Sequence, residues 1–303
     1  MARRPYRILS ADDASVSLAV RVACTCRELL LAAGVSRAAA AAAEAEHRVT
    51  REGAALQAPV ALEPGDVVVL ALEPADPDFP DVAPADVVWA DPCGILLAAN
   101  KPAGLLVHPD GTGAECLADR VQGRLAADGR IRCAHAVQRL DVDTTGLVLF
   151  SLAPEFQAAM DAQVADGSME KCYLAVLAGD LARDLVVEQP VGRDRHNARR
   201  MHVGSGRPAL TRFSPVGTVS LGGRRTGTLV EATIATGRRH QIRAHAAWAG
   251  FPVAGDRLYG GPAADALMLH GWREGFRHPL TWESVRVEAP VPAPMAGLIA
   301  GLL

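Results

Sequence analysis

The sequence predicts an α+β protein built around a mixed sheet, and two observations carry this prediction. Beyond residue 88, short β-like runs broken by Gly and Pro outnumber the helical candidates and do not alternate with them regularly, which favours a mixed sheet over a doubly wound parallel one. Before it, a segment rich in Pro and acidic residues separates off a smaller N-terminal part. Half of the 303 residues are hydrophobic, so the chain can form folded cores and is not a disordered protein.

The N-terminal part, residues 1–72, reads as a small α/β domain. An apolar series that ends at Gly34 predicts one helix, and Ser36 is a candidate N-cap for a second, Ala-rich helix. Strands are expected near 47–51 and 67–72, the second because its run VVVLAL follows a Glu-Pro-Gly-Asp turn.

A linker and a larger domain follow. Residues 73–86 hold four Pro and five acidic residues, which is a linker composition, and we place the linker at 73–87 and the second domain at 88–303. The expected strands of this domain are the runs GILLAAN, GLLVHP, GLVLFS, YLAVLAG, GTLVEATIAT and VRVEAP. Its expected helices cover 114–127, 154–166 and 239–250.

Charge is distributed unevenly along the chain. The formal net charge of −3 excludes a wholly basic nucleic-acid coat. Residues 1–100 carry 8 basic and 14 acidic side chains, whereas 101–303 carry 23 basic and 20 acidic ones. The steepest stretch, 193–212, has six Arg and one Asp, which is either a solvated face or a set of phosphate contacts. Only Lys101 and Lys171 are Lys among the 31 basic residues, and codon bias explains the excess of Arg.

The cysteines and the N-terminus predict a protein of a reducing compartment. The sequence has no CxxC pair and no Cys/His set at zinc-site spacing, so we expect no metal. The N-terminus, MARRPYRILSADD, lacks the apolar core of a secretory signal. No run approaches the roughly 18 uncharged apolar residues of a membrane span. We therefore expect a soluble, cytoplasmic protein.

The densest group of polar side chains lies at 135–151. Arg139, Asp141, Asp143 and two Thr come directly before an apolar run, and catalytic groups often occupy loops held by such a rigid element. A turn in which Asp and Thr side chains bond their own backbone is the alternative. The spacing alone does not decide between the two.

A second polar segment, TGRRHQIRAH, begins at Thr236 and is expected to start a helix. His240 and His245 are five residues apart and diverge by about 140° on a helix, so they cannot bind one metal together. Arg243 lies at the start of an apolar helix, where an unpaired charge would be costly, and we expect a carboxylate partner for it.

Two further segments contain the lysines. AANKPAGLLVHP reads as a strand, a tight turn and another strand, with Lys101 at the turn. MEKCYLAVLAGD reads as a strand that places Lys171 and Tyr173 on one face and apolar residues on the other.

Taken in order, these segments resemble the RluA-type family of RNA pseudouridine synthases. The family signature is His-Arg-Leu-Asp, two spacers and Thr-Ser-Gly, and the run QRLDVDTTG matches it except that Gln138 replaces His and Thr145 replaces Ser. Further matching blocks lie along residues 88–295. They are NKPAG at 100–104, Lys171 with Tyr173, TGR at 236–238 with HQIR at 240–243, GD at 255–256 with YG at 259–260, and LH at 269–270 with Phe276 and HP at 278–279. The resemblance implies a mainly antiparallel catalytic domain with helices and loops around a central cleft.

The resemblance also implies an activity and its residues. Asp141 corresponds to the catalytic aspartate, which attacks C6 or C1′ of a target uridine so that the glycosidic bond breaks and the uracil rejoins through C5. Tyr173 corresponds to the tyrosine that packs under the base and assists removal of the C5 proton. Arg243 corresponds to the basic partner of the aspartate, and Arg139 to the residue that fills the gap left by the flipped nucleotide. No cofactor or metal is implied.

Physical chemistry supports these roles. An adjacent guanidinium keeps a carboxylate ionised inside a pocket, as a nucleophile requires. A stacked uridine exposes neither C6 nor C1′, so the base must flip out, and a planar Arg can stack in the vacancy. Aromatic residues make up only 4% of the chain, so cationic side chains rather than rows of stacking rings must carry affinity.

We expect a monomer that binds RNA, either rRNA or tRNA, and no membrane. The predicted RNA contacts are Arg139, Lys101, Lys171, Arg199, Arg200, Arg238 and His240.

The N-terminal part is similar to a degenerate S4 RNA-binding domain. Ser36 opens its second helix and a Pro-Gly-Asp turn precedes its last strand, but the helix AAAAAAEAE lacks the Lys and Arg that such domains direct at phosphates. We expect reduced RNA binding there, or a role in packing and protein contacts. Two alternatives for the whole chain are a non-catalytic RNA-binding or assembly protein that keeps the fold, and a hydrolase that uses Asp141 and Asp143.

Overall fold

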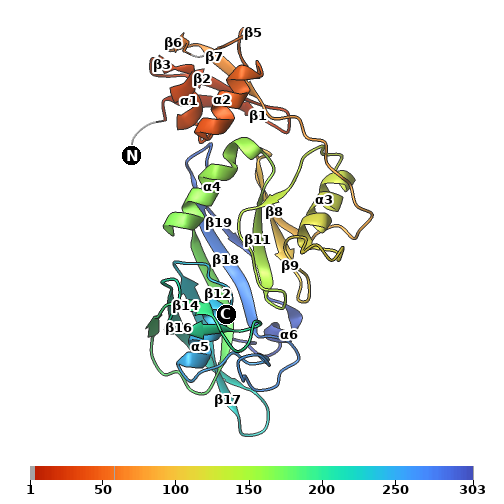
Figure 1. The fold of residues 1–303 in the computed structure, drawn as a ribbon, viewed down its shortest axis with the longest axis vertical. Helices are drawn as coiled ribbons and strands as arrows, with labels where there is room; N and C mark the ends of the chain where they lie inside the picture. The colour runs from red at the N-terminus through yellow and green to blue at the C-terminus, as the bar shows by residue number, and fades with distance from the viewer. Residues whose placement is uncertain (1–3, 58, 303) are drawn as a thin grey trace.

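The structure, a computed structural model, describes residues 4–57 and 59–302. The molecule is elongated, with a small N-terminal unit at one end and a long sheet that occupies the rest (Figure 1).

The N-terminal unit combines an antiparallel five-stranded sheet, of order β1-β2-β7-β4-β5, with two helices. Its elements are β1 (Tyr6–Ala11), β2 (Ser15–Val20), α1 (Cys26–Ala32), α2 (Arg37–Ala45), β4 (Val49–Arg51), β5 (Ala54–Ala55) and β7 (Val67–Ala71), beside a ribbon of β3 (Cys24–Thr25) and β6 (Ala61–Leu62).

Both helices and both strands predicted for this unit are present. The side chain of Ser36 accepts a hydrogen bond from the Ala39 N–H and so caps α2, as expected. The hairpin of β1 and β2 is missing from the prediction, although alternate residues of β2 are buried. This period of two is itself a strand signal.

The N-terminal unit is docked on the second domain. Residues 72–86 contain no helix or strand. The apolar core of the unit nevertheless continues into α4 (Pro154–Asp166) of the second domain. Tyr6 Oη also donates a hydrogen bond to the Leu280 carbonyl oxygen at 2.6 Å. The two parts therefore share buried contacts besides the linker.

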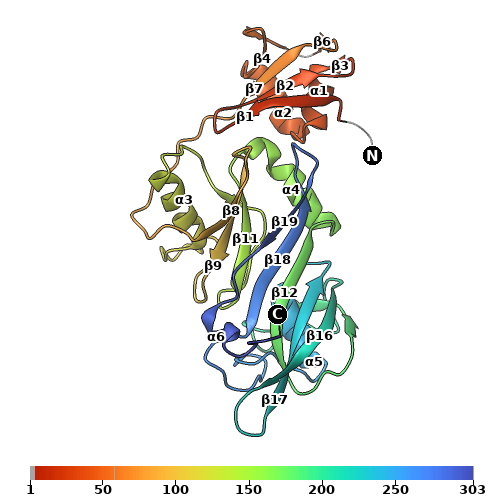
Figure 2. The ribbon, with the colours of Figure 1, turned by 180° about the vertical axis from the view of Figure 1, so that it is seen from behind.

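The second domain is organised by a ten-stranded sheet, seen as one twisted layer in Figure 2. Its order is β13-β16-β17-β12-β18-β11-β9-β8, with β10 on β11 and β19 on β18, and only the β11–β18 pair is parallel. The mixed, mainly antiparallel fold is confirmed. The strands are β8 (Val87–Ala90), β9 (Leu96–Lys101), β10 (His135–Ala136), β11 (Thr145–Ser151), β12 (Glu170–Ala178), β13 (Leu185–Glu188), β16 (Leu210–Ser220), β17 (Thr226–Ile234), β18 (Leu269–Arg277) and β19 (Ser284–Glu288).

The three predicted helices of this domain are present, but one starts later than expected. They are α3 (Leu117–Ala127), α4 and α5 (Gln241–Trp248); a short α6 (Ala293–Ala296) and a ribbon of β14 (Val191–Arg193) and β15 (Met201–Val203) complete the domain. The helix does not start at Thr236, because the Thr236 hydroxyl and the Arg238 N–H both bond the side-chain oxygen of Gln241 and close a loop before α5.

The run GLLVHP was expected to be a strand, and this prediction is wrong. Only an isolated bridge between Leu106 and Cys116 forms there. The carbonyl oxygens of Pro102 and Leu105 turn inward to accept hydrogen bonds from Lys101 Nζ, at 2.9 and 2.7 Å. A strand would have directed such carbonyls at a neighbouring strand.

Two glycines bring the start of β11 against β18. Gly146 has φ of 116°, and a Cβ there would lie 2.1 Å from the carbonyl oxygen of Gly271. Only Gly permits this conformation and this approach. The parallel pairing of Thr145 with His270 follows, and the polar loop before β11 is thereby held at the centre of the sheet.

Candidate active site

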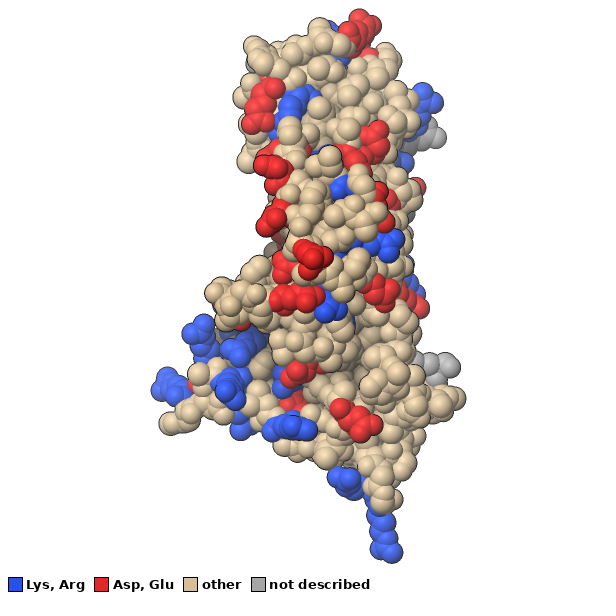
Figure 3. Space-filling view, turned by 90° about the vertical axis from the view of Figure 1, so that its right-hand side faces the viewer, with Lys and Arg blue, Asp and Glu red and all other residues tan. Residues whose placement is uncertain are grey.

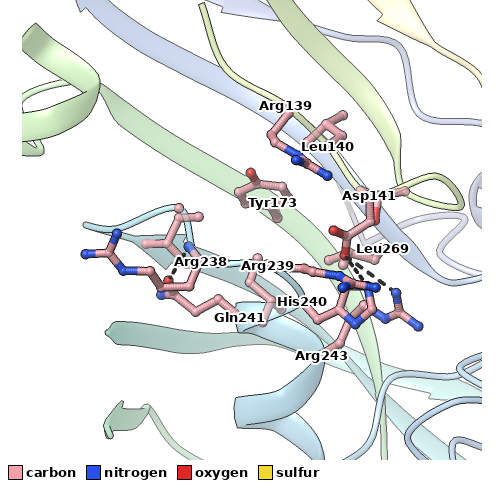
Figure 4. A pocket seen from close by; sticks show the side chains of 14 residues that line it. Arg139, Leu140, Asp141, Tyr173, Arg238, Arg239, His240, Gln241, Arg243 and Leu269 are labelled. Atoms are coloured by element: carbon pink, nitrogen blue, oxygen red, sulfur yellow. Dashed lines mark hydrogen bonds and ion pairs between the residues drawn. The ribbon is translucent and has the colours of Figure 1, made fainter. Parts of the chain in front are cut away.

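A pocket at the centre of the sheet is lined by polar residues from two segments that are far apart in the sequence. The loop before β11 and the start of α5 face each other across β12 (Figure 4). The lining residues are Arg139, Leu140, Asp141, Thr144, Tyr173, Ile234, Gly237, Arg238, Arg239, His240, Gln241, Ile242, Arg243 and Leu269.

Asp141 presents its carboxylate to this pocket. It lies four residues before β11, and its carbonyl oxygen accepts the Thr144 N–H at 3.1 Å, which closes a turn. Its side chain is 18% exposed, and Oδ2 lies 3.5 Å from Arg243 Nη1. The turn is closed by the backbone and not by Asp or Thr side chains bonding their own backbone, and it leaves the Asp141 carboxylate facing the pocket.

Arg243 is held mainly by a second carboxylate, Asp256. Arg243 Nε and Nη2 donate to its two oxygens at 2.7 and 2.9 Å, and Asp256 is fully buried. Burial is the largest single influence and opposes the charge on Arg243, but the hydrogen bonds with Asp256 and the charges of Asp256 and Asp141 together outweigh it and raise the pKa of Arg243. The buried Arg has the expected carboxylate partner, and Asp141 shares the same guanidinium. The sequence analysis missed Asp256, although it lies in the matching GD block.

Tyr173 forms part of the pocket wall on β12, below Arg139 and to the left of Asp141 in Figure 4. Its side chain is 9% exposed. Burial, with the nearby carboxyls of Glu274 and Asp141, raises the pKa of Tyr173 well above its ordinary value. The phenol therefore stays protonated at neutral pH, which favours packing against a base over direct removal of a proton by a phenolate.

His240 lies next to Asp141 in a left-handed backbone conformation. It is the N-cap of α5, with φ of 52°. Nε2 lies 3.9 Å from Asp141 Oδ2, and Nδ1 lies 3.2 Å from the hydroxyl of Tyr259. Burial lowers the pKa of His240, so the ring is neutral at pH 7. The structure thus places this predicted RNA contact inside the pocket, beside the carboxylate.

Comparisons with known proteins decide the family. A sequence profile described as RNA pseudouridylate synthase matches residues 95–248. The chain is 34% identical over 224 residues to the uncharacterised RNA pseudouridine synthase YhcT of Bacillus subtilis, with 72% of each chain covered. The chain belongs to the RNA pseudouridylate synthase family. The RluA-type resemblance and the isomerase activity that it implies are confirmed.

Other relatives of this pseudouridine synthase extend the comparison. The chain is 35% identical to ribosomal large subunit pseudouridine synthase D of Xylella fastidiosa, over 83% of this chain and 82% of that one. The Nitrosomonas europaea protein of the same name is 33% identical, over 68% of this chain and 62% of the relative. The solved structure of human RNA pseudouridylate synthase domain containing 1 shares the fold, with a TM-score of 0.58, 22% identity and coverage of 69% and 84%. The S4-like character of the N-terminal unit stays a prediction.

The two lysines of the synthase are not where RNA contacts were expected. Lys101 is fully buried, and its ammonium donates to three carbonyl oxygens, those of Pro102, Leu105 and Val142. The RNA-binding prediction for Lys101 is therefore wrong, since this side chain fixes the loops around the Asp141 turn. Lys171 is 4% exposed and faces a groove beside the active-site pocket.

The predicted arginine contacts surround the pocket. Arg139 and Arg199 are exposed, whereas Arg200 and Arg238 are half-buried. Arg139 and Arg238 line the pocket, and Arg199 and Arg200 precede β15. In Figure 3, Lys and Arg side chains gather at the height where Figure 1 places β14, β16 and α5. A cationic surface thus adjoins the active site of the synthase.

The two departures from the family signature are accommodated below the pocket. Gln138 Nε2 donates to Glu274 Oε1, and Thr145 Oγ1 lies 2.8 Å from His270 Nδ1. Burial raises the pKa of Glu274 to about 7 and lowers that of His270 to about 4. Both substitutions therefore support buried polar groups and leave Asp141 in place.

Two other groups of polar residues give no second site within the described ranges. Asp143 is exposed and does not line the pocket, so the Asp141/Asp143 hydrolase is not supported. Asp91, Cys93 and His278 lie close together, but His278 Nδ1 accepts two backbone N–H groups and its Nε2 lies 3.1 Å from Asp91. The Nε2 proton then faces the carboxylate, which leaves no ring nitrogen free for a metal.

The described helices of the synthase do not reach the length and apolar character that a membrane-crossing helix needs.

Proposed function

We propose that Asp141 is the nucleophile with which this synthase converts uridine to pseudouridine in structured RNA. The observation that carries the proposal is the position of the Asp141 carboxylate, 3.5 Å from the Arg243 guanidinium and in one pocket with the Tyr173 ring. A carboxylate attacks in its ionised form, and the Arg243 guanidinium places a compensating positive charge beside it. Asp256 supports this arrangement, because it holds Arg243 at a fixed angle through two hydrogen bonds.

The reaction conserves all atoms of the nucleotide. The carboxylate attacks C6 of the ring or C1′ of the ribose, and the N1–C1′ bond breaks. The uracil turns, C5 bonds to C1′, the bond to Asp141 breaks, C5 loses its proton and N1 gains one. The carboxylate is regenerated, so neither a cofactor nor an oxidant enters the balance. Tyr173 stays protonated and packs against the base during this rotation.

Arg139 supports the flipped state of the target nucleotide. Its side chain is exposed at the rim of the pocket, where it can stack on the bases that remain in the helix. Arg238 and the cationic residues of 193–212 lie on the same side and supply phosphate contacts.

We propose large-subunit ribosomal RNA as the substrate, with transfer RNA as the alternative. Support comes from the relatives named ribosomal large subunit pseudouridine synthase D, at 31% to 35% identity. The protein would act as a monomer, in the cytoplasm. Mapping pseudouridines in ribosomal and transfer RNA from cells with and without the gene tests this proposal. Loss of sites only from transfer RNA would contradict it.

The nucleophile is tested by the substitution Asp141→Asn, with Asp143→Asn as its matched control. Asn keeps the shape of the side chain but cannot act as the nucleophile, so pseudouridine formation should fall below detection while RNA binding survives. Asp143 is two residues away and exposed, so its variant should keep the wild-type rate. Full activity of Asp141→Asn would exclude the proposal, and a wild-type protein without activity on any cellular RNA would favour the non-catalytic alternative.

A further inference from the structure

We propose that Tyr259 is a positioning residue that links the Arg-rich segment 193–212 to the Asp141 carboxylate through His240. The inference rests on the proposed function, because it takes Asp141 as the nucleophile.

Tyr259 is held in place between β15 and α5, the helix that carries Arg243. It is 7% exposed and packs in a small apolar cluster with Val203 of β15 and Ala244 of α5. Its backbone N–H donates to Asp256 Oδ1 at 3.1 Å, and the same oxygen accepts a hydrogen bond from Arg243. Tyr259 is therefore anchored to the carboxylate that positions Arg243.

The Tyr259 hydroxyl fixes the proton on His240. The Met201 N–H donates to the Tyr259 oxygen at 2.7 Å, so the hydroxyl proton is free to point at His240 Nδ1, 3.2 Å away. A neutral imidazole that accepts at Nδ1 carries its proton on Nε2. That nitrogen lies 3.9 Å from Asp141 Oδ2.

The opposite proton arrangement is unfavourable at both ends. With the proton on Nδ1, the Nε2 lone pair would face the Asp141 carboxylate, and two negative sites would approach each other. The Tyr259 oxygen would then accept two hydrogen bonds and leave its own proton without this partner. The geometry therefore leaves His240 neutral with its Nε2–H turned toward the Asp141 carboxylate across 3.9 Å, so that the ring faces the nucleophile and adds no second positive charge to it.

The backbone of His240 has an uncommon conformation inside the pocket. A φ of 52° is uncommon for residues other than Gly, although His, Asn and Asp adopt it more often than the rest. No side-chain hydrogen bond caps α5 at this residue, so capping does not explain the conformation. Such conformations persist where the surrounding contacts over-determine them, typically at functional sites.

The ring of Tyr259 connects this device to the cationic surface. The guanidinium carbon of Arg200 lies 5.2 Å from the ring centroid, and that of Arg243 lies 5.4 Å from it. Arg200 directly precedes Met201, whose N–H holds the hydroxyl. Phosphate binding at residues 193–212 therefore affects the hydrogen bond from the Met201 N–H to the Tyr259 hydroxyl. That hydroxyl orients His240, and His240 faces Asp141.

The test is Tyr259→Phe, which keeps the ring and removes the hydroxyl. The variant loses the hydrogen bond between the hydroxyl and His240. We expect the single-turnover rate at saturating RNA to fall about tenfold, which corresponds to a rise of about 1.4 kcal/mol in the activation free energy. The Kd for RNA should change less than about twofold, because the stacked ring and its arginines remain. The control is Tyr6→Phe, which removes a buried hydroxyl bonded to the Leu280 carbonyl oxygen and should leave the rate unchanged.

A double-mutant cycle with His240→Asn separates positioning from a general structural effect. Asn tolerates the left-handed backbone but is too short to bridge Tyr259 and Asp141. In that background Tyr259→Phe should cause no further fall in rate. An equal fall in both backgrounds, a wild-type rate for Tyr259→Phe, or a change confined to Kd would each overturn the inference. An active Asp141→Asn variant would instead overturn the proposed function on which it rests.

Discussion

Lys101 shows how one ammonium group can organise an active-site loop. It is fully buried at the end of β9, and its three donors match the carbonyl oxygens of Pro102, Leu105 and Val142 at 2.9, 2.7 and 2.7 Å. Val142 follows Asp141 directly, so this contact ties the nucleophile's turn to the loop after β9. A compact ammonium can aim three donors at converging carbonyls, whereas a planar guanidinium cannot.

We expect Lys101→Arg and Lys101→Met to lower the free energy of unfolding by about 3 kcal/mol, since three hydrogen bonds of about 1 kcal/mol each are lost or distorted. Urea unfolding measures this loss. Arg277→Met is the control, because Arg277 is exposed at the end of β18 and should lose much less. Equal stability of Lys101→Arg and the wild type would show that the choice of Lys over Arg is accidental.

The same residue gives a pH dependence with a defined sign. Burial lowers the pKa of Lys101 to about 8, from 10.5 in the unfolded chain. Between these values the unfolded chain binds more protons, so the wild-type free energy of unfolding should rise with pH relative to that of Lys101→Met. The same urea titrations, repeated from pH 7 to about pH 10, check this slope. A parallel pH course in the two proteins would contradict it.

At the residue scale, the sequence predicted which proposed catalytic residues share a pocket better than it predicted the contacts around them. Asp141, Tyr173 and Arg243 lie in one pocket, as the motifs implied. Asp256 was missed, because its pairing with Arg243 depends on a loop that returns to α5 after 13 residues. Lys101 was misassigned for a related reason, since no spacing along the chain shows that three carbonyl oxygens converge on one nitrogen.

At the scale of elements, strands with regular apolar character were predictable and charged central strands were not. β11 and β12 are nearly continuous apolar runs and were found. β18 lies between them in the sheet, but its sequence LHGWREGFR contains two Gly and three charged residues. Gly271 is required by the close approach to Gly146, and Glu274 is buried against Gln138. Tertiary contacts thus override the local pattern.

The element that precedes β15 should carry much of the affinity for RNA. Arg195 and Arg199 are exposed there, and the Arg199 carbonyl oxygen accepts a hydrogen bond from Arg239, which lines the pocket. Replacing both with Gln should reduce the slope of log Kd against log salt by between one and two, since each phosphate contact contributes about 0.7 to 0.9. Filter-binding or fluorescence titrations at several salt concentrations measure this slope.

The matched control uses two arginines at the other end of the sheet. Arg224 and Arg225 are exposed in the turn before β17, whereas Ile234, at the end of that strand, lines the pocket. Nine residues of strand separate these positions by roughly 25 Å. Replacing both arginines with Gln should leave the salt slope unchanged. A larger effect there than at Arg195 and Arg199 would place the RNA path elsewhere.

At the scale of the whole molecule, the N-terminal unit is fixed to the catalytic domain at several points. Arg132 is 3% exposed and donates to the carbonyl oxygens of Glu73 and Asp13. Arg130 pairs with the Asp13 carboxylate on the same turn. A unit held in this way is not a freely tethered RNA-binding arm, which supports the packing role that its Ala-rich, Lys-free second helix suggested.

Glu155 makes polar contacts with both the N-terminal unit and the linker. It is fully buried at the start of α4, and its Oε1 accepts hydrogen bonds from Arg48 Nη1 at 2.9 Å and from the Glu73 N–H at 2.6 Å. Its carbonyl oxygen accepts the Ser36 N–H at 3.1 Å. Glu155 of the catalytic domain therefore accepts hydrogen bonds from the linker, from the start of α2 and from Arg48 of the N-terminal unit.

We expect Glu155→Ala to uncouple the two parts of the molecule. It removes the hydrogen bonds from Arg48 and from the Glu73 N–H, although Arg48 keeps its second partner Glu46. At about 1.5 kcal/mol for each hydrogen bond to a charged group, the loss is about 3 kcal/mol, and the N-terminal unit should unfold in a separate, earlier calorimetric transition. No residue of that unit lines the active-site pocket among the described residues, so turnover by the folded enzyme should be unchanged. Asp161→Ala, on an exposed face of the same helix, is the control. A single transition at the wild-type temperature would mean that the apolar contacts with α4 hold the unit alone.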